Sequence, residues 1–169
     1  MLRTIKVKRI KPVEDYCVDC GLCEVACITY HSQYKNDPIK AFKYEKPRPV
    51  SRTKLYSNSP VSISVSCRHC VDAACMEACI TGAIYRDLGT GHVKVNPAKC
   101  VGCWNCVMAC PYGAIHPSPR PRYEVDYDKF AGIAVKCDLC SGRETPACVE
   151  ACPNGALKVE EFEIEVLER

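Results

Sequence analysis

The sequence has no apolar run that approaches the roughly 18 residues needed to cross a bilayer. Its first residues, MLRTIKVKRIK, alternate apolar and basic side chains and lack the continuous apolar segment of a secretory signal. Aromatic residues make up only 8% of the 169 positions, with one Trp and three Phe. The chain is therefore short of large core side chains. From the missing apolar run and the missing signal we expect no membrane span and a cytoplasmic location.

Patterns for substrate chemistry are also missing. The sequence has no Walker loop, no GxGxxG dinucleotide motif and no recognisable pairing of a nucleophile with a base. We therefore predict that the chain is not an enzyme by itself. The formal net charge of +3 is weak support for nucleic-acid binding, because basic and aromatic residues do not interleave into a reading surface. We expect no nucleic-acid partner.

Cysteine is the residue in excess. The chain has 16 Cys, a fraction that usually means disulfides or metal sites. A chain that is not exported keeps its thiols in a reducing compartment, so structural disulfides are disfavoured and metal ligation is favoured. The cysteines form four quartets with none left over: Cys17, Cys20, Cys23 and Cys27; Cys67, Cys70, Cys75 and Cys79; Cys100, Cys103, Cys106 and Cys110; Cys137, Cys140, Cys148 and Cys152.

The spacing inside the quartets favours iron–sulfur clusters. The first and third quartets have gaps of two, two and three residues, the bacterial ferredoxin pattern in which the fourth Cys ligates the other cluster of a pair. Four Cys₄ zinc sites would use as many thiolates, but zinc ribbons place two CxxC pairs well apart. Pro111 and Pro153 follow the fourth Cys of their quartets, and we expect this Cys-Pro step to start a helix that points the thiolate away.

An internal repeat extends beyond the cysteines. Three quartets close with nearly the same phrase, which is ACITGAI at 78–84, ACPYGAI at 109–115 and ACPNGAL at 151–157. A fixed phrase with variable insertions indicates one unit that has been duplicated twice.

With these quartets the sequence resembles, over residues 14–158, the four-cluster ferredoxin-type iron–sulfur subunits of anaerobic oxidoreductases. Such subunits accompany tungsten or molybdenum enzymes, hydrogenases and carbon monoxide dehydrogenases. The resemblance implies an α+β fold of two bacterial-ferredoxin-like modules, with pseudo-two-fold internal repeats and with short strands and helices around the clusters. Residues 1–27 and 111–169 would form the outer module and residues 67–110 the inner module. Residues 28–66 would be a connecting insertion that docks a partner.

The same resemblance implies four [4Fe–4S] clusters with nested ligands and no catalytic residue. In the outer module the ligand sets would be Cys17, Cys20, Cys23 with Cys152, and Cys137, Cys140, Cys148 with Cys27. In the inner module they would be Cys67, Cys70, Cys75 with Cys110, and Cys100, Cys103, Cys106 with Cys79.

The function that follows is electron transfer. We predict a non-catalytic subunit of a hetero-oligomeric complex that relays single electrons between a catalytic oxidoreductase subunit and a flavoprotein or other carrier. The catalytic subunit would be a tungsten- or molybdenum-dependent aldehyde-type enzyme or a nickel carbon monoxide dehydrogenase, and the flavoprotein would use FAD and NAD(H). The alternative is a free soluble polyferredoxin that shuttles electrons between enzymes.

The residue patterns predict a pairing of the two ends, one hairpin and one further strand. Apolar residues alternate with basic ones near the N-terminus, around Val7, and with acidic ones near the C-terminus, around Ile164. Opposite charges across strands stabilise pairing by roughly 0.2–1 kcal/mol, so we predict that the two ends share a sheet. We also predict a β-hairpin over residues 83–96 and a short strand within 123–129.

Histidine and tryptophan near the cysteines are expected to support the clusters. His69, inside the second quartet, could tune a cluster through a hydrogen bond or through its charge. Trp104, inside the third quartet, would shield a cluster from water. As ligands, all four histidines are surplus beside sixteen cysteines: His31, His69, His92 and His116.

Overall fold

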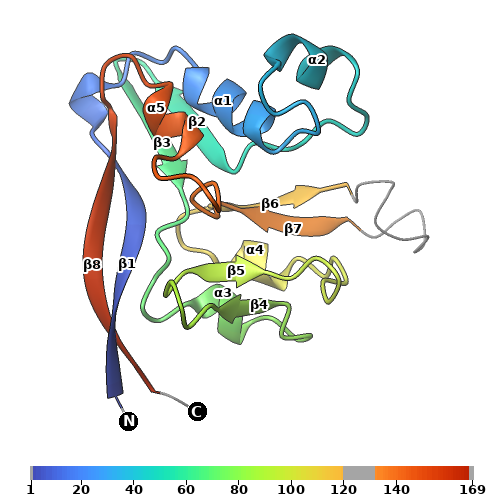
Figure 1. The fold of residues 1–169 in the computed structure, drawn as a ribbon, viewed down its shortest axis with the longest axis vertical. Helices are drawn as coiled ribbons and strands as arrows, with labels where there is room; N and C mark the ends of the chain where they lie inside the picture. The colour runs from blue at the N-terminus through green and yellow to red at the C-terminus, as the bar shows by residue number, and fades with distance from the viewer. Residues whose placement is uncertain (1, 120–131, 168–169) are drawn as a thin grey trace.

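The computed structural model of the chain describes residues 2–119 and 132–167, which form a small α+β fold (Figure 1). Apart from two long strands, the elements in these residues are short, and each sheet has two strands. In chain order the elements are β1 (Leu2–Pro12), the 3₁₀ turn η1 (Glu14–Tyr16), α1 (Leu22–Tyr30), α2 (Pro38–Lys43), β2 (Thr53–Asn58), β3 (Val61–Ser66), α3 (Ala74–Glu77), β4 (Ile84–Arg86), β5 (Val93–Val95), α4 (Asn105–Ala109), β6 (Ile115–Ser118), β7 (Ile133–Lys136), α5 (Ala147–Glu150) and β8 (Leu157–Leu167).

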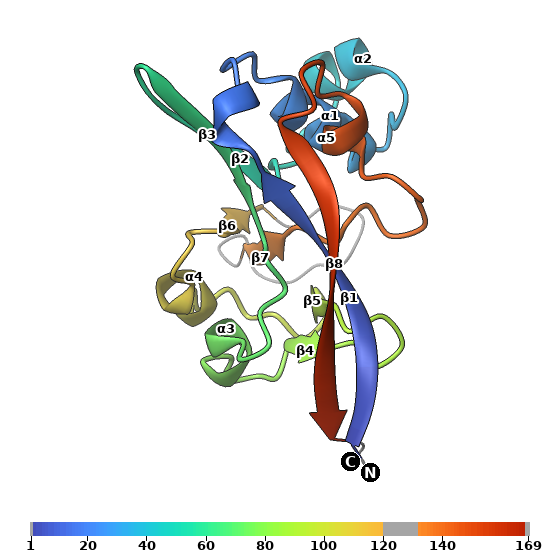
Figure 2. The ribbon, with the colours of Figure 1, turned by 90° about the vertical axis from the view of Figure 1, so that its left-hand side faces the viewer.

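The two long strands pair along their whole length, which confirms that the two ends of the chain share a sheet. β1 and β8 are antiparallel, with Lys6 opposite Glu163 and Lys8 opposite Glu161. Lys8 forms an ion pair with Glu161 at 3.5 Å, whereas Val7 between the two lysines is fully buried. Figures 1 and 2 show this twisted ribbon standing along one side of the molecule. The alternation in the sequence therefore separates a charged face from a buried one.

The other three sheets are hairpins. β4 and β5 form the hairpin that the sequence predicts over residues 83–96, with Ile84 opposite Val95. Gly91 in its turn has a φ of 70°, and a Cβ there would collide with the side chain of Val7. Glycine therefore lets this hairpin lie against β1. β6 pairs with β7 and β2 with β3, and the strand predicted within 123–129 lies outside the described residues.

The long stretch without cysteine, residues 28–66, contains α2 and the β2–β3 hairpin as well as the end of α1. α2 begins after Asp37, whose side chain accepts a hydrogen bond from the backbone N–H of Lys40 and so caps the helix. Leu55 of β2 and Ile63 of β3 line the same cavity as three cysteines of the first quartet. The hairpin thus covers part of a cysteine site.

Four of the helices each contain the third Cys of a quartet. α1 also contains the fourth, whereas in α3, α4 and α5 the fourth Cys follows the helix. The expectation that the Cys-Pro step starts a helix is therefore wrong. Pro111 and Pro153 lie in turns, because Gly113 and Gly155 two residues further on have φ values of 58° and 64°. After each of these turns the chain enters a strand, β6 or β8, and not a helix.

The four helices that contain cysteines pack in two pairs, which brings quartets together. α1 packs against α5, and α3 packs against α4; Figure 2 shows the two pairs in different parts of the molecule. Both larger core clusters contain cysteines among their buried members, and eight of the sixteen cysteines are buried. Cysteine therefore supplies much of the interior that the scarce aromatic residues leave unfilled.

Candidate iron–sulfur sites

The loops of the four quartets turn backbone amides toward sulfur. The N–H groups of His69 and Leu139 donate to Sγ of Cys67 and Cys137, each at 3.4 Å. Such donors favour the thiolate, which is the form that ligates metal. The loops share one backbone feature, because in each quartet the residue two positions after the first Cys has a left-handed φ: Asp19 (56°), His69 (48°), Gly102 (70°) and Leu139 (56°).

The repeated closing phrase encodes the same turn three times. Its glycine, three residues after the fourth Cys, donates its N–H to the carbonyl of that Cys in every case. One residue later, the N–H groups of Ala114 and Ala156 donate to Sγ of Cys110 and Cys152, at 3.4 and 3.2 Å. Glycine suits this turn because φ is positive at Gly82 (62°), Gly113 (58°) and Gly155 (64°).

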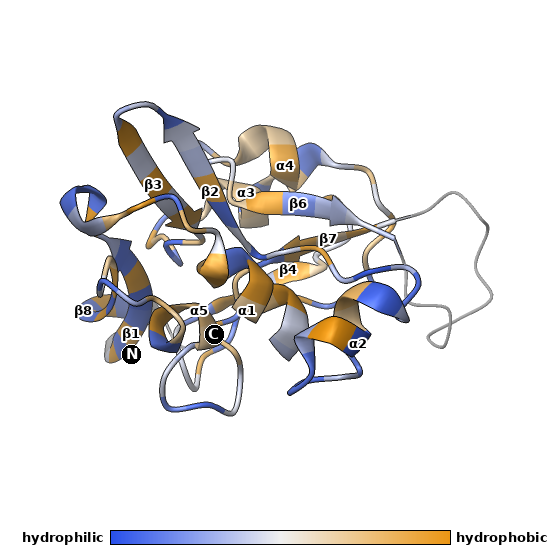
Figure 3. Ribbon diagram, turned by 90° about the horizontal axis from the view of Figure 1, so that it is seen from above, coloured by the Kyte–Doolittle hydropathy of each residue, from blue (hydrophilic) through white to orange (hydrophobic). Residues whose placement is uncertain are grey.

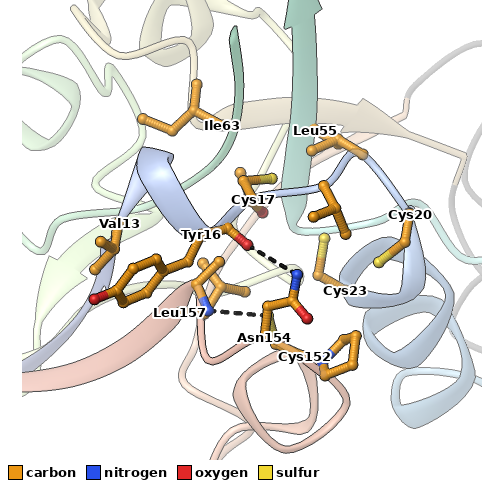
Figure 4. A pocket seen from close by; sticks show the side chains of 15 residues that line it. Val13, Tyr16, Cys17, Cys20, Cys23, Leu55, Ile63, Cys152, Asn154 and Leu157 are labelled. Carbon is orange, nitrogen blue, oxygen red and sulfur yellow. Dashed lines mark hydrogen bonds between the residues drawn. The ribbon is translucent and has the colours of Figure 1, made fainter. Parts of the chain in front are cut away.

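The cysteines come together in four groups, which we number sites I to IV. The cysteines of site I are Cys17, Cys20, Cys23 and Cys152. They line one solvent-connected cavity with about 420 Å³ of empty space, seen from close by in Figure 4. Asn154 Nδ2 donates to the carbonyl of Tyr16 at 3.3 Å and so ties the loop after Cys152 to the loop before Cys17. Site I therefore combines three cysteines of the first quartet with the last cysteine of the fourth.

Site II is the most enclosed group. It consists of Cys137, Cys140, Cys148 and Cys27, all of which are buried. Burial raises the pKa of Cys148 strongly, and the charges of Cys27 and Cys140 raise it further. Burial also raises the pKa of Cys137, to which the charges of Cys148 and Cys27 contribute. Four thiolates could share this space only with a cation between them.

A hydrogen-bonded network surrounds Cys27 of site II. The backbone N–H of Arg52 donates to Cys27 Sγ at 3.2 Å, and the Arg52 guanidinium donates to Asp138 at 2.5 Å. His31 Nε2 lies 3.1 Å from the same carboxylate. Burial alone would lower the pKa of His31, but its hydrogen bonds to Asp138 and Cys27 raise the pKa to about 9. His31 therefore adds positive charge beside Cys27, a role that no motif in the sequence predicts.

Sites III and IV are built on the α3–α4 pair. Burial, together with the smaller effect of the charges of its three companions in site III, raises the pKa of Cys75 to about 11 against the opposing charge of Lys136. Burial likewise raises the pKa of Cys106, followed by the charges of its companions in site IV. Site III consists of Cys67, Cys70, Cys75 and Cys110, and site IV of Cys100, Cys103, Cys106 and Cys79.

Two further observations fit iron–sulfur clusters at these sites. None of the sixteen cysteines is in a disulfide, so every thiol is available as a ligand. His69 is fully buried and its Nδ1 accepts the N–H of Val93 at 3.2 Å, while its Nε2 has no partner among the described residues. Burial, followed by the charge of Lys136, lowers the pKa of His69 to about 2. A neutral ring with an orphan Nε2–H can donate a hydrogen bond to a cluster sulfur but cannot act through charge.

Trp104 lies inside the third quartet with a left-handed φ of 63°. Its ring is half-buried and sits so close to Gly132 that a Cβ on Gly132 would lie 2.9 Å from it. Neighbouring Cys103 is nevertheless exposed. Shielding of site IV from water by Trp104 stays a prediction.

Cysteine sites on ferredoxin-type loops define an iron–sulfur protein. The chain matches the family model of the 4Fe-4S dicluster domain over residues 61–162. It therefore belongs to this family.

Relatives agree with this assignment. The chain is 38% identical to "Iron-sulfur protein" of Rhodospirillum rubrum over 151 residues, which cover 86% of this chain and 77% of the relative. It is 40% identical to the electron transport protein HydN of Escherichia coli over 150 residues, 83% and 81% of the two chains. It is 33% identical to the thiosulfate reductase electron transfer subunit PhsB of Salmonella typhi over 150 residues, 86% and 71%. The chain is thus a non-catalytic iron–sulfur electron-transfer protein.

Within residues 2–119 and 132–167, no helix combines the length and the apolar character needed to span a bilayer.

Proposed function

We propose that the chain holds four [4Fe–4S] clusters at sites I to IV and relays single electrons as a subunit of an oxidoreductase complex. A bound cluster would accept and release one electron at a potential set by its surroundings. One observation carries the proposal: every site combines three cysteines of one quartet with the last cysteine of another. This combination is what the cluster pairs of ferredoxins need.

Contacts between sites support a relay in the order I, II, III, IV. Cys148 of site II is close enough to Cys23 of site I for their charges to interact. Cys137 of site II interacts in the same way with Cys67 of site III. Sites III and IV share one core cluster, in which Cys75 and Cys110 pack with Cys100 and Cys106. Each site therefore lies next to the following one, from site I to site IV.

The two ends of this series are the places where electrons could enter and leave. Cys20 of site I and Cys103 of site IV are the only exposed cysteines. Exposed apolar side chains accompany both, including Val18 and Leu22 beside Cys20 and Val101 beside Cys103. Helix α4 of site IV is largely hydrophobic in Figure 3, and its Met108 is 86% exposed. Such surfaces suit protein partners.

We further propose which module holds which sites and which proteins are the partners. The outer module, residues 1–27 and 111–169, would hold sites I and II, and the inner module, residues 67–110, would hold sites III and IV. Residues 28–66 would contribute to partner docking. The catalytic partner would be a tungsten- or molybdenum-dependent aldehyde-type oxidoreductase or a nickel carbon monoxide dehydrogenase, and a FAD/NAD(H) flavoprotein would be the second partner, in the cytoplasm.

The experiment is an anaerobic purification followed by measurement of iron, acid-labile sulfide and zinc per chain. We expect about sixteen iron and about sixteen sulfide, with a brown colour that dithionite bleaches. A colourless protein with about four zinc would overturn the proposal. About twelve iron would contradict the four-cluster relay.

Affinity purification from the native host distinguishes a subunit from a free polyferredoxin. We expect a tagged chain to retain a catalytic oxidoreductase subunit through washing at moderate salt. Recovery of the brown protein alone would identify a free shuttle and overturn the proposed place in a complex.

A further inference from the structure

A lysine is buried where the proposed modules meet. Lys136 is the last residue of β7 and is only 3% exposed. Its ammonium group donates to the carbonyl of Val93 on β5 and, at 3.4 Å, to the carbonyl of Cys137. The side chain therefore reaches from the β6–β7 hairpin to the β4–β5 hairpin, beside sites II and III.

This ammonium group lacks an acidic partner. Among the described residues its hydrogen bonds go to backbone carbonyls, and no carboxylate lies within 4 Å of it. Asp138 lines the same cavity, but its two oxygens bind His31 and Arg52. Lysine is almost never fully buried unless it is paired, because burial of a lone charge is costly. The surroundings of Lys136 therefore call for an anion.

The thiolates of site III are candidates for that anion, because the charge of Lys136 acts on two of them. Burial raises the pKa of Cys75 and of Cys70, and the charge of Lys136 opposes the rise at both. A second cation, Arg86, flanks the same site. Its guanidinium donates to the carbonyls of Cys70 and Val71 at 2.5 and 2.7 Å, and it forms no ion pair among the described residues.

The other sites have no comparable excess of positive charge. At site I the charge that acts on Cys23 from outside the cysteines is that of Glu24, which is negative. At site IV the largest charges that act on Cys106 are those of Cys100, Cys79 and Cys103. At site II, Arg52 is paired with the carboxylate of Asp138, and Arg143, whose charge acts on Cys140, is paired with Glu150. Site III is thus the group that combines two cations with no carboxylate bound to either.

We propose that Lys136 is the counter-ion of the cluster at site III and, together with Arg86, gives this cluster the highest reduction potential of the four. This inference rests on the proposed function. Reduction adds one negative charge, and a nearby ammonium stabilises the added charge in a medium of low dielectric constant. Lys136 would therefore make an interior site of the series the first to be reduced.

The test is a redox titration of the anaerobically purified full chain, followed by electron paramagnetic resonance. Lys136→Gln removes the charge and keeps hydrogen-bond donors, and Lys136→Arg keeps the charge. We expect Lys136→Gln to lower the potential of the first of the four reduction steps. At the midpoint of the unaltered protein its reduced-to-oxidised ratio should fall at least tenfold, which for one electron is about 59 mV. Lys136→Arg should leave that step near its original potential.

Three controls make the result specific. Lys6→Met removes an exposed lysine of β1 and should leave all four steps in place. Cys75→Ser must alter the same first step, which assigns that step to site III. If Lys136→Gln does not assemble its clusters, Arg86→Gln carries the same expectation with a half-buried side chain.

The outcomes separate this inference from the proposed function. Unchanged potentials in Lys136→Gln or in its Arg86→Gln substitute, with the full iron content, would overturn the counter-ion role and leave the relay intact. If Lys136→Arg lowers the potential as much as Lys136→Gln does, the side chain acts as a structural bridge between the hairpins. That result would also overturn the counter-ion role. Missing iron in the unaltered protein would instead overturn the proposed function.

Discussion

Sites I and II are built on the same pair of helices, yet they differ in their contact with water. α1 carries Cys23 of site I and Cys27 of site II, and α5 carries Cys148 of site II and leads to Cys152 of site I. All four cysteines of site II are buried, whereas Cys20 of site I is exposed. The packing of α1 against α5 therefore fixes where the thiols lie, and the loops around the helices decide how far solvent reaches them.

The two sites also differ in the charges around them. Site II has His31 and Arg52 beside it, both bound to Asp138. Site I has Glu24, whose carboxylate accepts the backbone N–H of Leu55 at 2.8 Å. One helix pair thus supports an enclosed site with cations and an open site with an anion. A series of clusters needs both kinds, since interior sites must exclude water and terminal sites must reach a partner.

The largest expected effect is the loss of iron when one cysteine is removed from site I or from site II. Cys148→Ala should lose about four to eight of about sixteen iron per chain, because no water or small thiol can replace a ligand in a buried site and α5 also positions Cys152. Cys20→Ala should lose roughly one iron, because solvent or an added thiol reaches the vacant position. Iron and sulfide analysis of the two variants, purified side by side without oxygen, measures the difference.

Added thiol sharpens this comparison. We expect 2-mercaptoethanol during purification to restore iron to Cys20→Ala and to have no effect on Cys148→Ala. Equal losses in the two variants, or equal rescue, would show that exposure does not distinguish the sites.

A smaller effect is expected from the acidic residues beside the two sites. Asp138 and Glu24 have similarly exposed side chains, at 27% and 28%. Asp138→Asn leaves both His31 and Arg52 without their counter-charge, which should cost about 1.5–3 kcal/mol. Glu24→Gln keeps an oxygen for the N–H of Leu55 and breaks only a long contact to Lys54, so it should cost less than about 1 kcal/mol.

Heating without oxygen, followed by visible absorbance, compares these two variants. We expect Asp138→Asn to lose its clusters at a temperature at least about 3 °C lower than the unaltered chain. The temperature at which Glu24→Gln loses its clusters should lie within about 2 °C of the value for the unaltered chain. If Glu24→Gln is the less stable of the two, the charge network around Cys27 does not hold site II together.

Features of the fold that leave a regular pattern of residues were predictable from the sequence, whatever their separation along the chain. The β1–β8 pairing follows from residues that alternate around Val7 and Ile164, and the β4–β5 hairpin from the turn near Gly91. The β2–β3 hairpin was not predicted, since clear alternation is limited to Val61–Val65 and the turn contains Pro60. The Cys-Pro step was misjudged because proline starts helices in many proteins, while here a left-handed glycine follows it.

The candidate sites were predictable in part for the same reason. Three cysteines of each set are close in sequence, so their spacing reveals them, whereas the fourth comes from another quartet. In the outer module the fourth was assigned only through the family resemblance, while the compactness of residues 67–110 also supports the inner pairing. His31 and Asp138 are 107 residues apart, and Arg52 and Asp138 are 86 apart. Single side-chain contacts of this kind, unlike paired strands, leave no periodicity in the sequence. Lys136 was not singled out either, because nothing in a sequence marks a lysine as buried.

The smallest expected effect concerns two exposed side chains that bind backbone carbonyls. Asn154 Nδ2 donates to Tyr16 at the edge of site I, at 3.3 Å, and Ser141 Oγ donates to Asp138 beside site II, at 3.2 Å. Each bond should contribute about 0.5–1.5 kcal/mol. Asn154→Ala should raise the rate at which a chelator removes iron by up to about tenfold, which is what 1.4 kcal/mol permits, because it loosens a loop over an open site. Ser141→Ala should leave the rate unchanged, since the thiols of site II remain buried. Faster iron loss in Ser141→Ala than in Asn154→Ala would mean that site II, and not site I, is the open end of the pair.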